Sequence, residues 1–176
     1  MIISIVGGEG TGKTLLARRL GEALGLQVLE PMKDRLLAES GYHTLFEWDA
    51  ATGGLERLVS AQVERETALA SGIIDGGAVE LFCLVQRWAW HRLSPNRSER
   101  MRDLASAAAR RYQRVLVMPP RIVGGPAPGR FRSLPHNVQL TRLIDAFARE
   151  EALPLEHVDD GPADARVAQG LAWGEA

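Results

Sequence analysis

The chain has 176 residues, of which 45% are hydrophobic and 24% are charged, and its formal net charge is -1. This length and composition are typical of one globular domain with a sizeable core, so we expect a single domain over residues 1–176. The balanced charge gives no overall field that would attract nucleic acid or an anionic membrane, so neither is an expected partner.

Cysteine content and apolar runs indicate the compartment. The only cysteine, Cys83, lies in an apolar run and cannot form an internal disulfide, which suits a reducing environment. No stretch approaches the roughly twenty apolar residues that a membrane-spanning helix needs. Met1 leads directly into an apolar strand, without a basic leader. We therefore expect a cytoplasmic protein, and the sequence leaves a homodimer open.

Strands and helices are predicted to alternate along the chain. Short β-branched runs indicate strands, and apolar residues at helical spacing indicate helices. The predicted strands are residues 1–6, 27–29, 73–75, 115–118 and 155–158. The predicted helices are residues 13–24, 33–40, 55–69, 78–93, 98–112, with Ser98 as the N-cap, 138–151, and a terminal helix from Pro162. This alternation predicts an α/β domain with a parallel sheet and right-handed crossovers.

A glycine-rich loop joins the first strand to the first helix. Its sequence is Gly7-Gly8-Glu9-Gly10-Thr11-Gly12-Lys13-Thr14, which fits the Walker A pattern in the strand–loop–helix context that the pattern requires. The glycines let amide N–H groups turn toward a phosphate, and the helix adds its positive end. We expect Lys13 to contact the β- and γ-phosphates of ATP or GTP, and the Thr14 hydroxyl to ligate Mg²⁺. The dinucleotide-binding spacing of glycines is not met.

Two carboxylates are predicted at the carboxyl ends of strands, where sheets of this kind bind ligands. Asp75 follows Ile73-Ile74 and is the candidate to hold Mg²⁺ through water or to orient a phosphoryl acceptor. Glu30 is the candidate to accept the proton of an acceptor hydroxyl. The alternatives are a strand-end cap for Asp75 and a solvated loop acid for Glu30.

Residues 119–136 form a segment rich in proline and glycine that is too long for an ordinary connection. Segments of this kind often act as lids or binding loops. It carries Arg130 and Arg132, which are candidates to close over the phosphates during transfer. Solvated surface arginines are the alternative interpretation.

With these features the chain resembles the small-molecule kinases of the P-loop class. The phosphate loop, Glu30, Ile73-Ile74-Asp75 and the run 115–120 leading to Arg130 are similar to the AAA-type ATPase family that contains the ribosylnicotinamide kinase domain of bacterial NAD-biosynthesis regulators. Leu29-Glu30-Pro31 is similar to thymidylate and deoxynucleoside kinases. The resemblance implies five parallel strands in the order 2-3-1-4-5, helices on both faces, and Mg²⁺-dependent γ-phosphoryl transfer. Gly76 departs from it, because these kinases usually place an arginine there.

The sequence thus predicts an ATP-dependent kinase whose acceptor is a nucleoside, a nucleotide or a related small metabolite. The strand-end acids and the loop arginines favour this function. A regulatory or partner-dependent ATPase without a small-molecule acceptor is the alternative, and a third hypothesis is a fold that binds nucleotide without turnover.

Overall fold

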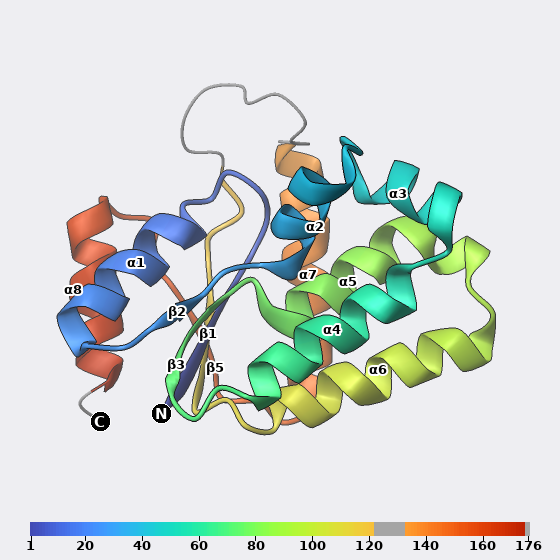
Figure 1. Cartoon of the computed structure of the whole chain (residues 1–176). Helices are drawn as coiled ribbons and strands as arrows, with labels where there is room; N and C mark the ends of the chain where they lie inside the picture. Colours follow the sequence, from blue (N-terminus) through green and yellow to red (C-terminus); the bar gives the residue numbers. More distant parts are fainter. Residues whose placement is uncertain (122–132, 175–176) are drawn as a thin grey trace.

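The sheet occupies the centre of the molecule in the computed structural model, which describes residues 1–121 and 133–174 (Figure 1). Its five parallel strands run in the order β2-β3-β1-β4-β5, as the resemblance implied. They are β1 (Ile2–Val6), β2 (Val28–Leu29), β3 (Gly72–Asp75), β4 (Arg114–Val117) and β5 (Leu155–His157). The register pairs Ile5 with Asp75 and Val6 with Val117, so β1 delivers the phosphate loop to the middle of the carboxyl edge.

Helices cover both faces of this sheet. Two of them, α1 (Lys13–Leu24) and α8 (Ala163–Gly174), pack on one face, at the left of Figure 1. The helices on the other side are α2 (Met32–Ser40), α3 (Leu45–Thr52), α4 (Leu55–Thr67), α5 (Gly77–Ala89), α6 (Pro95–Ala109) and α7 (Leu134–Glu150). Within residues 1–121 and 133–174, no helix is long and apolar enough to cross a membrane.

Strand β1 is buried on both faces, and its successive side chains feed two separate cores. Because strand side chains alternate with a period of two, Ile3 and Ile5 pack against the α1 side. Ile2 and Val6 join the larger core on the opposite side, which also contains Phe82 of α5. The run Ile2–Val6, apolar except for the buried Ser4, is therefore typical of a central parallel strand.

A buried carboxylate ties α4 to α5. Glu66 accepts hydrogen bonds from Gln62 Nε2 (2.7 Å), from the Ala78 amide (2.7 Å) and from the Tyr112 hydroxyl. Burial raises the pKa of Glu66, although these three donors favour its charged form. The network fixes the start of α5 beside the end of β3.

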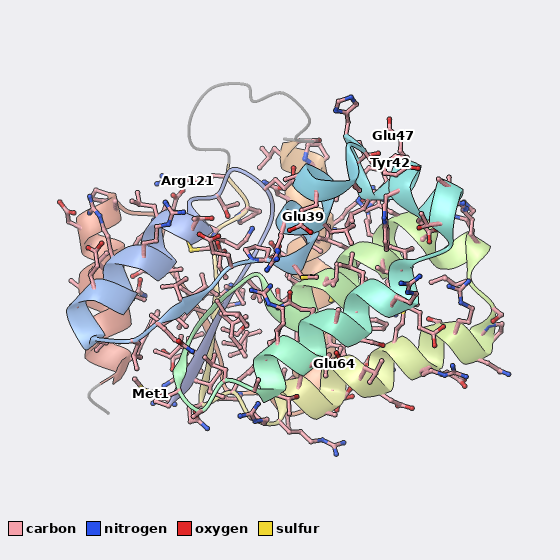
Figure 2. The ribbon with its side chains drawn as sticks, in the orientation of Figure 1. Met1, Glu39, Tyr42, Glu47, Glu64 and Arg121 are labelled. Carbon is pink, nitrogen blue, oxygen red and sulfur yellow. The ribbon has the colours of Figure 1, made fainter. Side chains whose placement is uncertain are left out.

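The main differences between the predicted and the observed helices lie at α3, α6 and α7. No helix was predicted over α3, although Thr44 and Glu47 form a capping box at its start; Glu47 is marked in Figure 2. The expected N-cap at Ser98 is wrong, because α6 begins at Pro95, whose fixed φ suits the first helical position. Helix α7 begins at Leu134 rather than at residue 138, so residues 134–136 of the predicted lid are helical.

Candidate functional site

The phosphate loop, residues 7–14, adopts a backbone that glycine makes accessible. Gly10 and Gly12 have φ angles of 76° and 94°, in the left-handed region that other residues avoid. Gly12 is the N-cap of α1 and provides no side-chain cap, so the first amides of the helix are left for another acceptor. The Nζ of Lys13 donates to the carbonyl oxygens of Gly7 (2.7 Å) and Gly8 (2.9 Å). This arrangement suits binding of an anion at the N-terminus of α1.

Helix α7 braces the loop through Asn137, which is fully buried. The Nδ2 of Asn137 donates to the Glu9 carbonyl oxygen at 3.1 Å. A Cβ at Gly8 would lie 1.9 Å from Asn137 Oδ1 and 2.7 Å from Asn137 Cβ. Only glycine therefore fits between the loop and the helix at this position.

Replacing Gly8 with alanine is expected to displace the loop and to weaken nucleotide binding at least about tenfold, together with a lower melting temperature. The clash is mainly with the Asn137 amide, so the double variant Gly8→Ala/Asn137→Ala should recover part of the loss. Titration calorimetry with MgATP measures the first effect. Equal affinities of Gly8→Ala and the parent would contradict this account of the packing.

Helix α8 supports the loop from the opposite side. The Nη1 of Arg166 donates to the Thr11 carbonyl oxygen at 3.2 Å, and Arg166 is buried. Asp160 pairs with Arg166 (3.5 Å) and with Arg121 (2.5 Å). Figure 2 places Arg121 at the same end of the sheet as the phosphate loop. Burial and the charge of Arg121 lower the pKa of Arg166.

Asp75 and Thr14 meet next to the loop. The Thr14 hydroxyl donates to Asp75 Oδ2 at 2.6 Å, and the Asp75 side chain is buried at the carboxyl end of β3. A hydroxyl and a carboxylate are hard oxygen ligands of the kind that Mg²⁺ prefers. The two residues predicted as metal ligands are therefore close together and chemically suited to the ion.

Glu30 lies in a different environment from Asp75. Its Oε1 accepts a hydrogen bond from Arg18 Nη2 at 3.1 Å, and 65% of its side chain is exposed. The Glu30 carbonyl oxygen accepts from Arg65 Nη1 at 3.0 Å. The role of Glu30 as a proton acceptor therefore stays a prediction. Arg130 and Arg132, the predicted lid arginines, fall outside the described residues, and their role also stays a prediction.

Glu80 of α5 is a residue of the site that the sequence reasoning missed. Its Oε2 accepts from the Gly7 amide at 2.9 Å, and its Oε1 lies 3.5 Å from Lys13 Nζ. Burial raises its pKa to about 7, against the opposing effect of Lys13 and then of Lys33. The sequence could have indicated this role, because Glu80 is an acid inside the apolar run Val79-Glu80-Leu81, and glutamates are rarely buried without a partner.

The backbone of this chain favours glycine at position 76, where the kinase pattern has arginine. Gly76 has a φ of 87°, which favours glycine, and a Cβ there would lie 3.3 Å from Glu80 Oε1. The Gly76 amide donates to the Ile5 carbonyl oxygen at 2.8 Å. An arginine at this position would require a strained backbone.

Removing the Glu80 charge is expected to change how stability depends on pH. The folded pKa of about 7 exceeds the ordinary value of 4.5, so the folded state binds more protons between these values. Its stability therefore falls as pH rises through this window, by up to about 1.4 kcal/mol per pH unit from this group. In Glu80→Gln this contribution should be absent, while that of Glu66 remains. Urea unfolding of the parent and of Glu80→Gln from pH 4.5 to 8 measures how the free energy of unfolding of each protein changes with pH. Identical slopes for the two proteins would refute the prediction.

A cavity of about 480 Å³, here called the α5 cavity, lies beside the phosphate loop. Apolar side chains of α2, α3, α4 and α5 make up half of its described lining residues, and Glu9 of the phosphate loop lines it as well. The Trp88 ring lies 5.1 Å from the His136 ring at an interplanar angle of 37°. The described lining residues are Glu9, Lys33, Leu37, His43, Thr44, Leu45, Asp49, Leu55, Leu84, Val85, Trp88, Ala89, Arg92 and His136.

This geometry can be compared with known proteins. The model of an AAA domain family matches residues 2–166, which is nearly the whole chain. The chain belongs to this AAA domain family. A comparison with curated proteins finds no significant match.

Solved structures similar to this AAA domain include three kinds of protein. Deoxyadenosine kinase from M. mycoides with bound dATP has a TM-score of 0.65 at 14% identity, covering 100% of both chains. NadR protein in complex with NR has a TM-score of 0.73 at 15% identity, covering 98% of this chain and 49% of that one. Shikimate kinase from Acinetobacter baumannii with shikimate has a TM-score of 0.57 at 18% identity, covering 97% and 90%. These likenesses confirm the P-loop kinase fold.

The site of this AAA domain thus combines predicted and unpredicted residues. The structure brings Lys13, Thr14 and Asp75 together, as expected from the motif and the strand end. Asn137 and Arg166 come from helices far along the chain and carried no motif that would have marked them. Only the packing of α7 and α8 on either side of the loop identifies them.

Proposed function

We propose that this AAA domain is an ATP-dependent phosphotransferase that transfers the γ-phosphoryl group to a small metabolite bound in the α5 cavity. The observation that carries the proposal is that Glu9 belongs both to the phosphate loop and to the cavity wall. An acceptor in the cavity would therefore lie next to phosphates bound by the loop. Such proximity of two reactants is the main requirement of phosphoryl transfer.

The loop residues would bind and orient the donor. The amides of residues 7–14 and Lys13 would hold the β- and γ-phosphates, and Thr14 with Asp75 would hold Mg²⁺. The ion, when bound, neutralises charge on the phosphates. Glu80 would position Lys13 and the Gly7 amide. Its Oε1 lies 3.5 Å from Lys13 Nζ, and its Oε2 lies 2.9 Å from the Gly7 amide nitrogen. The cavity would exclude water, which limits hydrolysis of the donor.

In the proposed reaction an acceptor hydroxyl oxygen forms a bond to the γ-phosphorus while the bond from that phosphorus to the β,γ-bridging oxygen breaks. ADP leaves with that oxygen, and the hydroxyl proton passes to a carboxylate. Glu30 is the candidate from the sequence. The structure favours Glu9 as a second candidate, because Glu9 lines the cavity while Glu30 pairs with Arg18 at an exposed position. Arg130 and Arg132 are proposed to close over the phosphates.

An assay of ADP release with a panel of nucleosides, nucleotides and other hydroxylated metabolites tests the proposal. Release that depends on an acceptor would support a kinase. Slow release that is independent of every acceptor would favour the regulatory ATPase instead. Nucleotide binding without release would favour a fold that binds nucleotide without turnover.

A further inference from the structure

Lysine is used at two positions in this chain, and both lie at the candidate site. Of the 21 lysine and arginine residues, only Lys13 and Lys33 are lysines, and every other one is an arginine. A lysine ammonium is a compact charge on a flexible stem, whereas an arginine guanidinium is a larger planar group. Lysine at position 33 therefore points to a demand for a compact cation there, as at Lys13.

Lys33 is largely buried although it carries a charge. Its side chain is only 11% exposed, and its Nζ lies 3.1 Å from Oε1 of Glu9, a residue of the phosphate loop. Burying an ammonium costs free energy that nearby anions have to offset. Lys33 is also the second residue of α2, where the positive end of the helix disfavours a cation. Both effects act against local stability, so this lysine is better explained by a role at the site.

Lys33 lies between the α5 cavity and the surroundings of Lys13. It lines the α5 cavity, and it also lines a narrow crevice together with Gly76 and Glu80. Burial raises the pKa of Glu80 to about 7, and the charges of Lys13 and then of Lys33 oppose this rise. Both ammonium groups therefore act on the same buried carboxylate, and they approach this region from different helices, α1 and α2.

A γ-phosphate bound by the loop would come close to both ammonium groups. Glu9 belongs to the loop and also lines the cavity, so an ammonium 3.1 Å from its carboxylate lies at the boundary between donor and acceptor. During transfer, negative charge is spread over the oxygens of the phosphoryl group as it crosses this boundary. A cation at this place stabilises the transition state more than the ground state, and such an interaction raises kcat.

We propose that Lys33 is a second catalytic lysine, which contacts the phosphoryl group while it passes from the donor to the acceptor. This inference rests on the proposed phosphotransferase function. In the structure, Glu9 holds the Lys33 ammonium at the cavity wall. When the donor binds, the ammonium exchanges part of this contact for an oxygen of the γ-phosphoryl group, because the flexible stem of lysine allows the movement. Lys13 then acts from the donor side and Lys33 from the acceptor side.

The first test removes the ammonium with Lys33→Met, which keeps an unbranched side chain. With the best acceptor, we expect kcat to fall at least about 100-fold and the Kd for MgATP to stay within about threefold of the parent, because the contact forms mainly during transfer. Lys33→Arg keeps the charge and should retain more activity than Lys33→Met. The matched control is Arg35→Met, whose side chain is 66% exposed on the same helix. An unchanged kcat in Lys33→Met would overturn the inference.

A double variant separates direct contact from support of Glu9. If Lys33 only held Glu9 in place, Lys33→Met would have no further effect once Glu9 is replaced by glutamine. We expect Lys33→Met to reduce kcat at least about tenfold in the Glu9→Gln background as well. Loss of the effect in that background would make Lys33 a positioning residue for Glu9 and would overturn its contact with the phosphoryl group.

Cysteine chemistry can restore the ammonium in one folded sample. Cys83 is fully buried and burial raises its pKa, so the thiol introduced by Lys33→Cys is the one expected to react. Its thiolate displaces bromide from bromoethylamine and forms a thioether that carries an ammonium at nearly the length of lysine. We expect this product to gain at least about tenfold in kcat over the unmodified variant. Alkylation with iodoacetamide adds a neutral amide and should give no gain, and equal activity of the two products would overturn the inference.

Aluminium fluoride gives a measurement that needs no acceptor. With MgADP it mimics the phosphoryl group in transfer, and such mimics bind more tightly than ground-state ligands. Lys33→Met should weaken binding of the MgADP–aluminium fluoride complex at least about 30-fold, while MgADP alone binds as in the parent. If no acceptor stimulates ADP release, the proposed function fails, but this difference would still support the role of Lys33. Equal affinity of the two proteins for the complex would overturn it.

Discussion

Lys13→Ala is expected to reduce turnover about 1000-fold or more and to weaken MgATP binding at least about tenfold. The Lys13 ammonium lies 2.7 Å from the Gly7 carbonyl oxygen, at the N-terminus of α1, where bound phosphates would be. Alanine removes the cation and also leaves the buried Glu80 carboxylate without its nearest positive charge. Titration calorimetry and steady-state kinetics measure the two effects.

The control for Lys13→Ala is Arg35→Ala. Arg35 pairs with Glu39 on the exposed side of α2, so its loss removes a cation without touching the phosphate loop. This variant should retain the affinity and turnover of the parent. If Lys13→Ala bound MgATP as tightly as the parent, the assignment of residues 7–14 as a phosphate loop would be refuted.

Asp75→Asn is expected to leave nucleotide affinity within a few-fold of the parent and to reduce turnover by about 100-fold to 10,000-fold. Asparagine keeps an oxygen that can accept a hydrogen bond from the Thr14 hydroxyl. That hydroxyl lies 2.6 Å from Asp75 Oδ2 in the parent protein, so the local geometry should persist. What is lost is the negative charge that would hold Mg²⁺ against the phosphates. The readouts are turnover at saturating ATP and its dependence on Mg²⁺ concentration.

Asp164→Asn serves as the matched control, because it removes an exposed carboxylate of α8 that pairs with Arg19 of α1 and not with a residue of β3. Thermal melting of both variants shows whether the buried position tolerates the change. A folded Asp75→Asn protein with near-normal turnover would remove Asp75 from the mechanism and would favour the strand-end cap.

The elements of this AAA domain that the sequence predicted best are those whose pattern is local. Helix α1 was predicted with its observed bounds, because Gly12 precedes it, Gly25 ends it, and Leu16 and Leu20 lie one turn apart. Helix α3 was not predicted because it has almost no apolar stripe, although Thr44 and Glu47 could have been recognised in the sequence as a capping box. Pro95 and Pro135 started α6 and α7 earlier than the apolar periodicity suggested.

The sequence by itself determined the phosphate loop and the strand-end position of Asp75, because glycine spacing and the alternation of strands and helices are local properties of the chain. Only the tertiary structure decided which distant groups surround that loop. Glu80, Asn137 and Arg166 contact it from α5, α7 and α8, at separations of 73, 128 and 155 residues. The α5 cavity is likewise formed by packing of α2, α3, α5 and α7 beside the loop, an arrangement that depends on three-dimensional contacts and leaves no periodic pattern in any one segment.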